Sequence, residues 1–141
     1  MQVETILQSK GRAVTTVSTR ATIAEAVDLL NTQRIGAVVV MDGTKVVGIL
    51  SERDIVRHLG KDWASLATRP VSEVMTRNVV ITSSKASIAD LMERMTEHRI
   101  RHIPVVEAGE LVGIVSIGDV VKRKIEETEQ EAIALKEYIA S

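Results

Sequence analysis

The sequence contains an internal duplication, and this feature constrains the fold more than any other. Residues Ile23–Arg57 align with Ile88–Lys122 at a constant offset of 65 without a gap, and 11 of the 35 aligned positions are identical. Several of the remaining pairs are apolar in both copies. Self-similarity of this kind marks a duplicated supersecondary unit. We therefore expect this chain of 141 residues to hold two copies of one small unit that pack together.

Each copy has the hydrophobic pattern of strand, helix, strand, strand and helix. A three-stranded sheet of this size cannot bury its faces alone, so we expect an α+β (mixed α/β) fold of two βαββα repeats related by a pseudo-two-fold axis. We place the first repeat at 1–68 (core 14–59), the second at 69–126 (core 79–125) and a C-terminal helical extension at 127–141. The predicted elements are a helix at 3–8, a strand at 14–17, a helix at 22–33, strands at 35–41 and 45–50, a helix at 51–59, a helical turn at 72–75, a strand at 79–82, a helix from 87 to about 98, strands at 103–106 and 110–116, and a helix from 116.

The end of each copy carries a hydroxyl and a carboxylate at the start of a helix. Ser51 and Asp54 follow an apolar strand in the first copy, and Ser116 and Asp119 occupy the same place in the second. A helix N-terminus presents unpaired N–H groups that suit an anion, and a carboxylate offers acceptor oxygens that suit the diol of a ribose. Ser-x-x-Asp is also a capping box, in which the side chains satisfy only the helix itself. The spacing alone leaves both interpretations open.

Glycine sets these two helix starts apart from the others. Thr22 and Ser87 also begin capped helices, but only Ser51 and Ser116 are preceded by a glycine and two aliphatic residues. At Gly48 and Gly113 the missing side chain allows close approach by another backbone or by a ligand. The repetition of this arrangement favours a ligand at both helix N-termini.

Composition excludes several classes of function. The net charge of −1 and the scarcity of aromatic residues argue against nucleic acid and an anionic membrane as partners. The chain has no cysteine, Ser-His-Asp spacing or Gly-rich phosphate loop to support an enzyme. His98 and His102 flank a predicted helix end without a nearby third ligand, so we predict no metal site there. With neither a signal peptide nor a membrane-spanning stretch, we expect a soluble, cytoplasmic protein.

The segments Gly48–Asp54 and Gly113–Asp119 resemble the closing motif of cystathionine-β-synthase-type (CBS) domains, Gly-aliphatic-aliphatic-Ser/Thr-x-x-Asp. The resemblance covers Val14 to about Ile125 and is supported by Val74-Met75-Thr76 and by Ile103-Pro104-Val105-Val106. It implies a tandem CBS pair, a stand-alone regulatory module rather than an enzyme. It also implies an adenosine-containing ligand (AMP, ADP, ATP, S-adenosylmethionine or NAD(H)) in clefts between the repeats, and an unidentified protein target regulated in trans.

The resemblance also implies site residues. Asp54 and Asp119 would hold ribose hydroxyls, and Ser51 and Ser116 would face phosphate or ribose. The other implied ligand-binding residues are Thr16, Ile81 and Thr82 around the adenine, the basic residues Arg53, Arg101 and His102, and Ile103.

The two copies differ at the basic positions. Arg101-His102 aligns with Gly36-Ala37, and Arg53 aligns with Gly118. We therefore expect two clefts that are not equivalent. A NAD(H)-binding redox-state sensor and a structural dimerisation adaptor with empty clefts are the alternative functions.

Beyond the duplication, apolar residues continue at helical spacing with steps of four and three. This heptad pattern predicts either a helix that folds back on its own domain or, as we favour, a helix that pairs with another copy and helps to build a homodimer. CBS pairs commonly dimerise, so the resemblance implies the same. The stripe consists of Val121, Ile125, Thr128, Ala132, Leu135 and Ile139.

Overall fold

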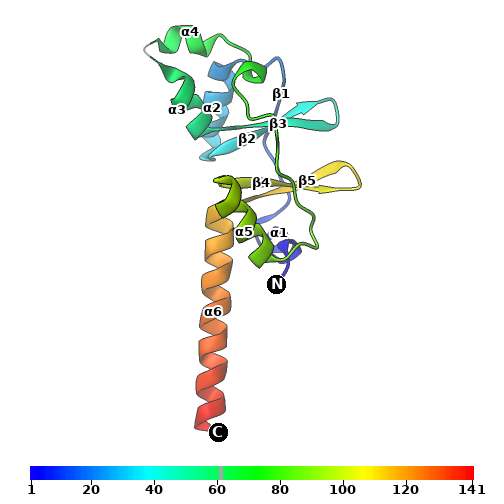
Figure 1. The fold of residues 1–141 in the computed structure, drawn as a ribbon, viewed down its shortest axis with the longest axis vertical. Coiled ribbons are helices and arrows are strands. Elements are labelled where there is room, and N and C mark those ends of the chain that lie inside the picture. The colour runs from blue at the N-terminus through cyan, green and yellow to red at the C-terminus, as the bar shows by residue number, and fades with distance from the viewer. Residues whose placement is uncertain (61) are drawn as a thin grey trace.

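The computed structural model describes residues 1–60 and 62–141 and stacks the two copies, with both β-hairpins pointing to the same side (Figure 1). It confirms the mixed α/β fold with a C-terminal helix. The elements are α1 (Val3–Lys10), β1 (Thr16–Ser18), α2 (Ile23–Gln33), β2 (Ala37–Asp42), β3 (Lys45–Ser51), α3 (Glu52–Leu59), α4 (Trp63–Ala67), the 3-10 helix η1 (Val71–Glu73), α5 (Ile88–His98), β4 (His102–Glu107), β5 (Glu110–Ser116) and α6 (Ile117–Ala140).

The backbone of one copy recurs in the other at the offset read from the sequence. Helices α2 and α5 both have 11 residues, and both end on an arginine in the left-handed region, Arg34 with φ 54° and Arg99 with φ 55°. The antiparallel hairpins share one register, because Ala37 lies opposite Ser51 in β2–β3 and His102 lies opposite Ser116 in β4–β5. Each hairpin also has its irregularity at the same aligned position. The prediction of a duplicated unit is therefore confirmed at the level of the backbone.

The predicted strand at 79–82 is wrong and shrinks to one parallel bridge between Thr82 and Val105. In the first copy, Val39 N–H donates to the carbonyl of Thr15 (3.1 Å) and extends the parallel pairing of β1 with β2. Pro104 stands at the position of Val39 and has no N–H to donate. The second copy thus loses the hydrogen bond that would lengthen its first strand.

Three smaller differences concern the ends and the connector. Helix α1 continues to Lys10 rather than ending at 8, and the predicted turn at 72–75 is the 3-10 helix η1. Helix α4 was not predicted, because its five residues are too few to show helical periodicity. Its N-cap Asp62 accepts a hydrogen bond from Ser65 N–H at 3.3 Å.

The structure has two apolar cores, one in each copy. The core of each copy is completed by the segment that stands before the other copy in the sequence. The core around α2 and the β1–β3 sheet includes residues of the connector between 66 and 75. The core around α5 and the β4–β5 hairpin includes Val3, Ile6 and Leu7 of α1. Backbone bonds hold both segments in place, for example Val3 N–H to Ala86 O (2.9 Å) and Thr76 N–H to Ile49 O (2.9 Å). The two copies are therefore tied together by exchanged segments.

The two glycines singled out by the sequence are closely approached by side chains of these segments. A Cβ on Gly48 would lie 2.3 Å from Met75 Sδ, and a Cβ on Gly113 would lie 2.7 Å from Leu7 Cδ2. The expected close approach is confirmed, and the protein atoms that make it belong to side chains rather than to backbone. The glycines admit the segment that completes each core.

Substituting these glycines tests the packing of both segments. We expect Gly113→Ala to lower the free energy of unfolding by about 1–3 kcal/mol, because Leu7 is fully buried and has little room to shift. Gly48→Ala is expected to cost less, because the flexible Met75 side chain can adopt another rotamer. Urea denaturation of both variants measures the difference; a larger loss at Gly48 would contradict this view of the packing.

Thr82 offers a second test of the cores. In the described part of the chain, its buried Oγ1 has no hydrogen-bond partner, and the aligned residue of the first copy is the buried Val17. We expect Thr82→Val to raise the free energy of unfolding by about 1 kcal/mol, because a buried hydroxyl without a partner is costly. The reciprocal Val17→Thr is the matched control and is expected to be destabilising. No gain from Thr82→Val in urea denaturation would show that the hydroxyl has a partner in solution.

Helix α6 begins in the second core and then leaves the body of the protein (Figure 1). Val120 is fully buried, whereas every residue from Thr128 to the end of the helix is exposed. The alternative in which this helix folds back on its own domain is therefore wrong. Among the described residues, no helix combines the length and apolar character needed to cross a membrane.

Candidate functional site

Both aspartates at the paired helix N-termini are members of complete capping boxes. Asp54 Oδ2 accepts from Ser51 N–H at 2.9 Å while Asp54 N–H donates to Ser51 Oγ at 3.3 Å. In the second copy the corresponding distances are 2.8 Å and 3.2 Å. The capping interpretation is thus confirmed at both positions. It does not exclude a ligand, because capping engages Oδ2 and a carboxylate has about four acceptor positions.

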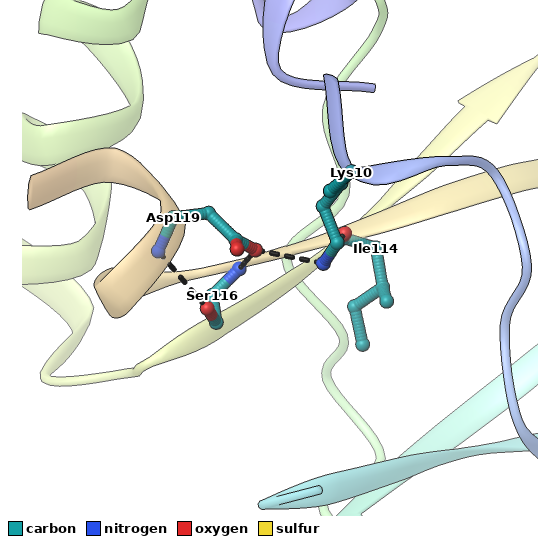
Figure 2. A network of polar contacts seen from close by, with 4 residues as sticks. All are labelled: Lys10, Ile114, Ser116 and Asp119. Carbon is teal, nitrogen blue, oxygen red and sulfur yellow. Dashed lines mark hydrogen bonds and ion pairs between the residues drawn. The ribbon is translucent and has the colours of Figure 1, made fainter. Parts of the chain in front are cut away.

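The surroundings of the two carboxylates differ. Asp54 Oδ1 accepts a hydrogen bond from the Thr76 hydroxyl at 3.2 Å. Asp119 is instead paired with Lys10 from the end of α1, whose ammonium donates to Asp119 Oδ2 (2.7 Å) and to the carbonyl of Ile114 (2.9 Å) (Figure 2). One carboxylate therefore meets a neutral hydroxyl, and the other already holds a cation of its own chain.

This ion pair changes the acidity of Asp119. Partial burial alone would raise the pKa of Asp119, but the hydrogen bonds from Lys10 and Ser116 outweigh it and hold that pKa below its usual value. The carboxylate is ionised at neutral pH, and its charge is balanced by Lys10. A ligand that used Asp119 would meet a carboxylate whose charge is already balanced by this lysine.

A cavity of about 400 Å³ lies beside Asp54, within the size range of small-molecule sites. Its lining residues come from both copies: from α3 and the neighbouring strand and connector on one side, and from the end of α5 and the start of β4 on the other. Four arginines and two carboxylates give it an excess of positive charge. The lining residues are Gly36, Ile49, Ser51, Glu52, Arg53, Asp54, Arg57, Thr76, His98, Arg99, Ile100, Arg101 and His102.

The structure brings five of the predicted site residues together in this cavity: Ser51, Arg53, Asp54, Arg101 and His102. The basic residues that distinguish the two copies thus face the same aspartate, which the sequence left open. The remaining predicted residues do not line it.

Those remaining residues lie in several environments. Ser116 and Asp119 form the second helix N-terminus with Lys10 (Figure 2). Ile103 is fully buried in the second core. Thr16 and Ile81 are exposed, while Thr82 is buried beside β4. Their roles in ligand binding stay predictions.

Sequence reasoning missed Arg57 and Thr76 as cavity residues, and it missed Lys10 as the partner of Asp119. Arg57 lies one helical turn after Asp54, so the spacing could have predicted that both side chains lie on the same face of the helix. Arg99 belongs to the same short basic stretch of the sequence as Arg101 and His102. Lys10 had no signal in the sequence, because its position beside Asp119 depends on the packing of distant segments.

Contacts across the cavity join the two copies. Arg53 Nη1 donates to the carbonyl of Arg99 at 3.4 Å. The His102 ring packs on Gly36, where a Cβ would lie only 3.1 Å from the imidazole. Burial is the main cause that lowers the pKa of His102, so this ring is neutral at physiological pH. The arginines therefore supply the positive charge of the cavity, and His102 supplies a neutral donor and acceptor.

A larger hollow of about 570 Å³ lies next to this cavity between α2 and α3. Aliphatic residues dominate its lining, and only Arg34 and Glu52 in it carry charge. The lining residues are Val27, Leu30, Asn31, Arg34, Ile35, Gly36, Glu52, Ile55 and Val56. The Asp54 cavity is smaller but combines a carboxylate, a hydroxyl and several arginines. Its chemistry makes it the better candidate for a polar ligand.

Comparison with known proteins assigns the fold to a family. The model of the CBS domain matches residues 10–61 and 71–126. The chain belongs to the CBS domain family. The CBS domain-containing protein YhcV of Bacillus subtilis is 38% identical over 109 residues, which cover 75% of this chain and 75% of YhcV.

Solved structures of CBS domain proteins have the same fold. The CBS-domain containing protein ATU1752 from Agrobacterium tumefaciens superimposes with a TM-score of 0.84 at 45% identity, covering 88% of this chain and 99% of that chain. The CBS domain pair of protein MJ0100 was solved in complex with 5′-methylthioadenosine and S-adenosyl-L-methionine. It superimposes with a TM-score of 0.79 at 26% identity, covering 90% of this chain and 98% of that chain.

The Lys10–Asp119 pair of this CBS domain protein gives a prediction about pH. Because the folded-state pKa of Asp119 is depressed, its contribution to stability is present above the unfolded-state pKa and is lost as the pH falls through the folded-state pKa. Lys10→Met is expected to lower the free energy of unfolding by about 0.5–1 kcal/mol at neutral pH, and this difference is expected to shrink as the pH falls through and below the ordinary titration range of an aspartate.

Urea denaturation over this pH range measures the effect, with exposed Lys45→Met as the control. A difference between wild type and Lys10→Met that does not depend on pH would show that the ion pair is not formed in solution.

Proposed function

We propose that this CBS domain pair is a regulatory module that binds a phosphorylated adenosine ligand in the Asp54 cavity and modulates a partner protein in trans. The observation that carries the proposal is the convergence of Asp54 and four arginines from both copies on one cavity. The complex of the related protein MJ0100 with 5′-methylthioadenosine and S-adenosyl-L-methionine supports an adenosyl ligand.

The charge of the cavity favours a nucleotide with phosphate. Arg53 and Arg57 come from α3, and Arg99 and Arg101 come from the segment between α5 and β4. Arginines bind phosphate oxygens in bidentate fashion, and the N-terminus of α3 adds the partial positive charge of the helix dipole. S-adenosylmethionine carries a cationic sulfonium and methylthioadenosine carries no charge. We therefore infer AMP, ADP or ATP as the preferred class.

The ribose position follows from Asp54. Its Oδ2 is engaged with Ser51, while Oδ1 contacts the Thr76 hydroxyl at 3.2 Å and keeps a further lone pair. A ribose diol can donate to this oxygen without breaking the helix cap. The Thr76 hydroxyl lies within reach to accept or donate beside it.

Regulation would follow from the fact that both copies contribute residues to the cavity. A ligand in this cavity contacts α3 of the first copy and the α5–β4 segment of the second, so it would favour the arrangement in which these elements lie close together. The weak direct contact between them, 3.4 Å from Arg53 to the Arg99 carbonyl, leaves room for such a change. A partner protein would read the resulting surface.

Ligand titration with a matched pair of variants tests the proposal. Asp54→Ala is expected to weaken AMP binding by about 10-fold or more, because hydrogen bonds to a charged group contribute about 1.5–3 kcal/mol. Asp119→Ala removes an equivalent helix cap and is expected to retain affinity within about threefold. The affinities of both variants and of the wild type are measured by calorimetric titration with AMP, ADP, ATP, NAD, NADH, S-adenosylmethionine and methylthioadenosine.

Arg101→Ala separates phosphate recognition from ribose recognition, because it is expected to weaken AMP binding without changing the affinity for methylthioadenosine. Stronger binding of NADH than of AMP would replace the proposal with a redox-state sensor. Binding of none of the seven compounds would leave a structural dimerisation adaptor. Equal losses in Asp54→Ala and Asp119→Ala would show that the Asp54 cavity is not the preferred site.

A further inference from the structure

Helix α6 presents an apolar stripe that its own chain does not cover. Of its 24 residues, Val121, Ile125, Leu135 and Ile139 are between 44% and 74% exposed. Together with Thr128 and Ala132 they continue the heptad spacing along one side of the helix. We call these six residues the α6 seam. In heptad notation Ile125, Ala132 and Ile139 are a positions, and Val121, Thr128 and Leu135 are d positions.

The α6 seam points away from the body of the protein. The side of α6 that contacts the body contains Val120, which is fully buried. It also contains Arg123, and the Nε atom of Arg123 lies 2.7 Å from Met1 Sδ. At 100° per residue, the mean direction of the seam is roughly opposite to this side. The seam is therefore not an extension of the domain core. A second helix can lie along the α6 seam without meeting the body of the chain that carries the seam.

The charges that flank the seam identify a second copy of this chain as the occupant. Lys124 and Glu131 occupy g positions, and Glu129 and Lys136 occupy e positions. In a parallel, in-register pair each g residue lies beside the e residue of the next heptad on the other helix. Lys124 then meets Glu129, and Glu131 meets Lys136. Twofold symmetry repeats both attractive pairs.

An antiparallel pair would bring like charges together. Full overlap of two antiparallel α6 seams places Glu129 beside Glu129, Glu131 beside Glu131, and Lys122 beside Lys136. Lys124 is also available for an intermolecular contact. Its ammonium lies 3.9 Å from Glu127 in the same helix, which is longer than a hydrogen bond.

We propose that two copies of this chain associate through a parallel, in-register α6 pair, with the two bodies on the outer sides of the coiled coil. This inference is independent of the proposed ligand. The seam spans about two and a half heptads, and Thr128 and Ala132 weaken its centre, so the dimer is expected to be concentration-dependent.

Disulfide trapping tests the direction and register, because the chain has no cysteine of its own. Thr128→Cys and Leu135→Cys place single thiols at two d positions. In the proposed pair each thiol faces its own copy within disulfide distance, so both variants are expected to form covalent dimers on mild oxidation. Gln130→Cys, on the outer side of the helix, is the matched control and is expected to stay monomeric on a non-reducing gel.

Charge reversal tests the flanking pairs on the full chain. Lys124→Glu is expected to raise the dimer dissociation constant roughly 5–30-fold at low salt, because two attractive pairs become repulsive. The double variant Lys124→Glu/Glu129→Lys is expected to return to within about threefold of the wild type. Glu137→Lys, at an outer position, is expected to have no effect. Sedimentation velocity over a concentration series measures all four proteins.

Trapping at both 128 and 135 together with rescue by the double charge reversal supports the proposal. Trapping at one position but not the other overturns it in favour of an antiparallel pair, in which a single position can face itself. A dimer that is insensitive to Lys124→Glu and is not trapped at either position overturns it in favour of an interface on the bodies. A monomer at all concentrations overturns it as well.

Discussion

The exchange of segments between the two copies is the packing constraint on which the rest of the structure depends. Neither sheet is large enough to bury its apolar face alone, so Leu7 of α1 completes the second core and Met75 of the connector completes the first. Each of these side chains lies on a glycine, Gly113 or Gly48, that stands three residues before the N-cap serine of a helix. The same contact that closes a core therefore determines what stands beside Asp54 and Asp119.

This coupling explains how a duplicated fold comes to have two different helix N-termini. The connector places Thr76 directly after Met75, and its hydroxyl meets Asp54. Helix α1 places Lys10 one turn after Leu7, and its ammonium meets Asp119. The backbones of the two copies match in register, yet one carboxylate faces a cavity with four arginines and the other is paired with a lysine. The asymmetry comes from the preceding segments as much as from the repeats.

Local and periodic features could be predicted from the sequence, whereas long-range packing could not. The offset of 65 predicted the equal hairpins, and the Ser-x-x-Asp spacing offered the capping boxes as one of two interpretations, because a capping box depends only on residues a few positions apart. The prediction of a strand at 79–82 was wrong because Pro104 has no N–H to donate to this segment. A hydrophobic pattern contains no information about a missing hydrogen-bond donor. Lys10 contacts a residue 109 positions away. No spacing rule connects residues that far apart.

The capping boxes also bear on how a site can be built at such a helix N-terminus. A carboxylate that bonds its own backbone is fixed in one orientation before any ligand arrives, so binding does not have to order it. Asp54 meets this condition through Ser51 and Thr76, and it shares its cavity with four arginines. Capping and ligand binding are therefore compatible roles of one side chain. What separates a helix cap that does nothing more from one that can hold a ligand is the space and the charge next to it.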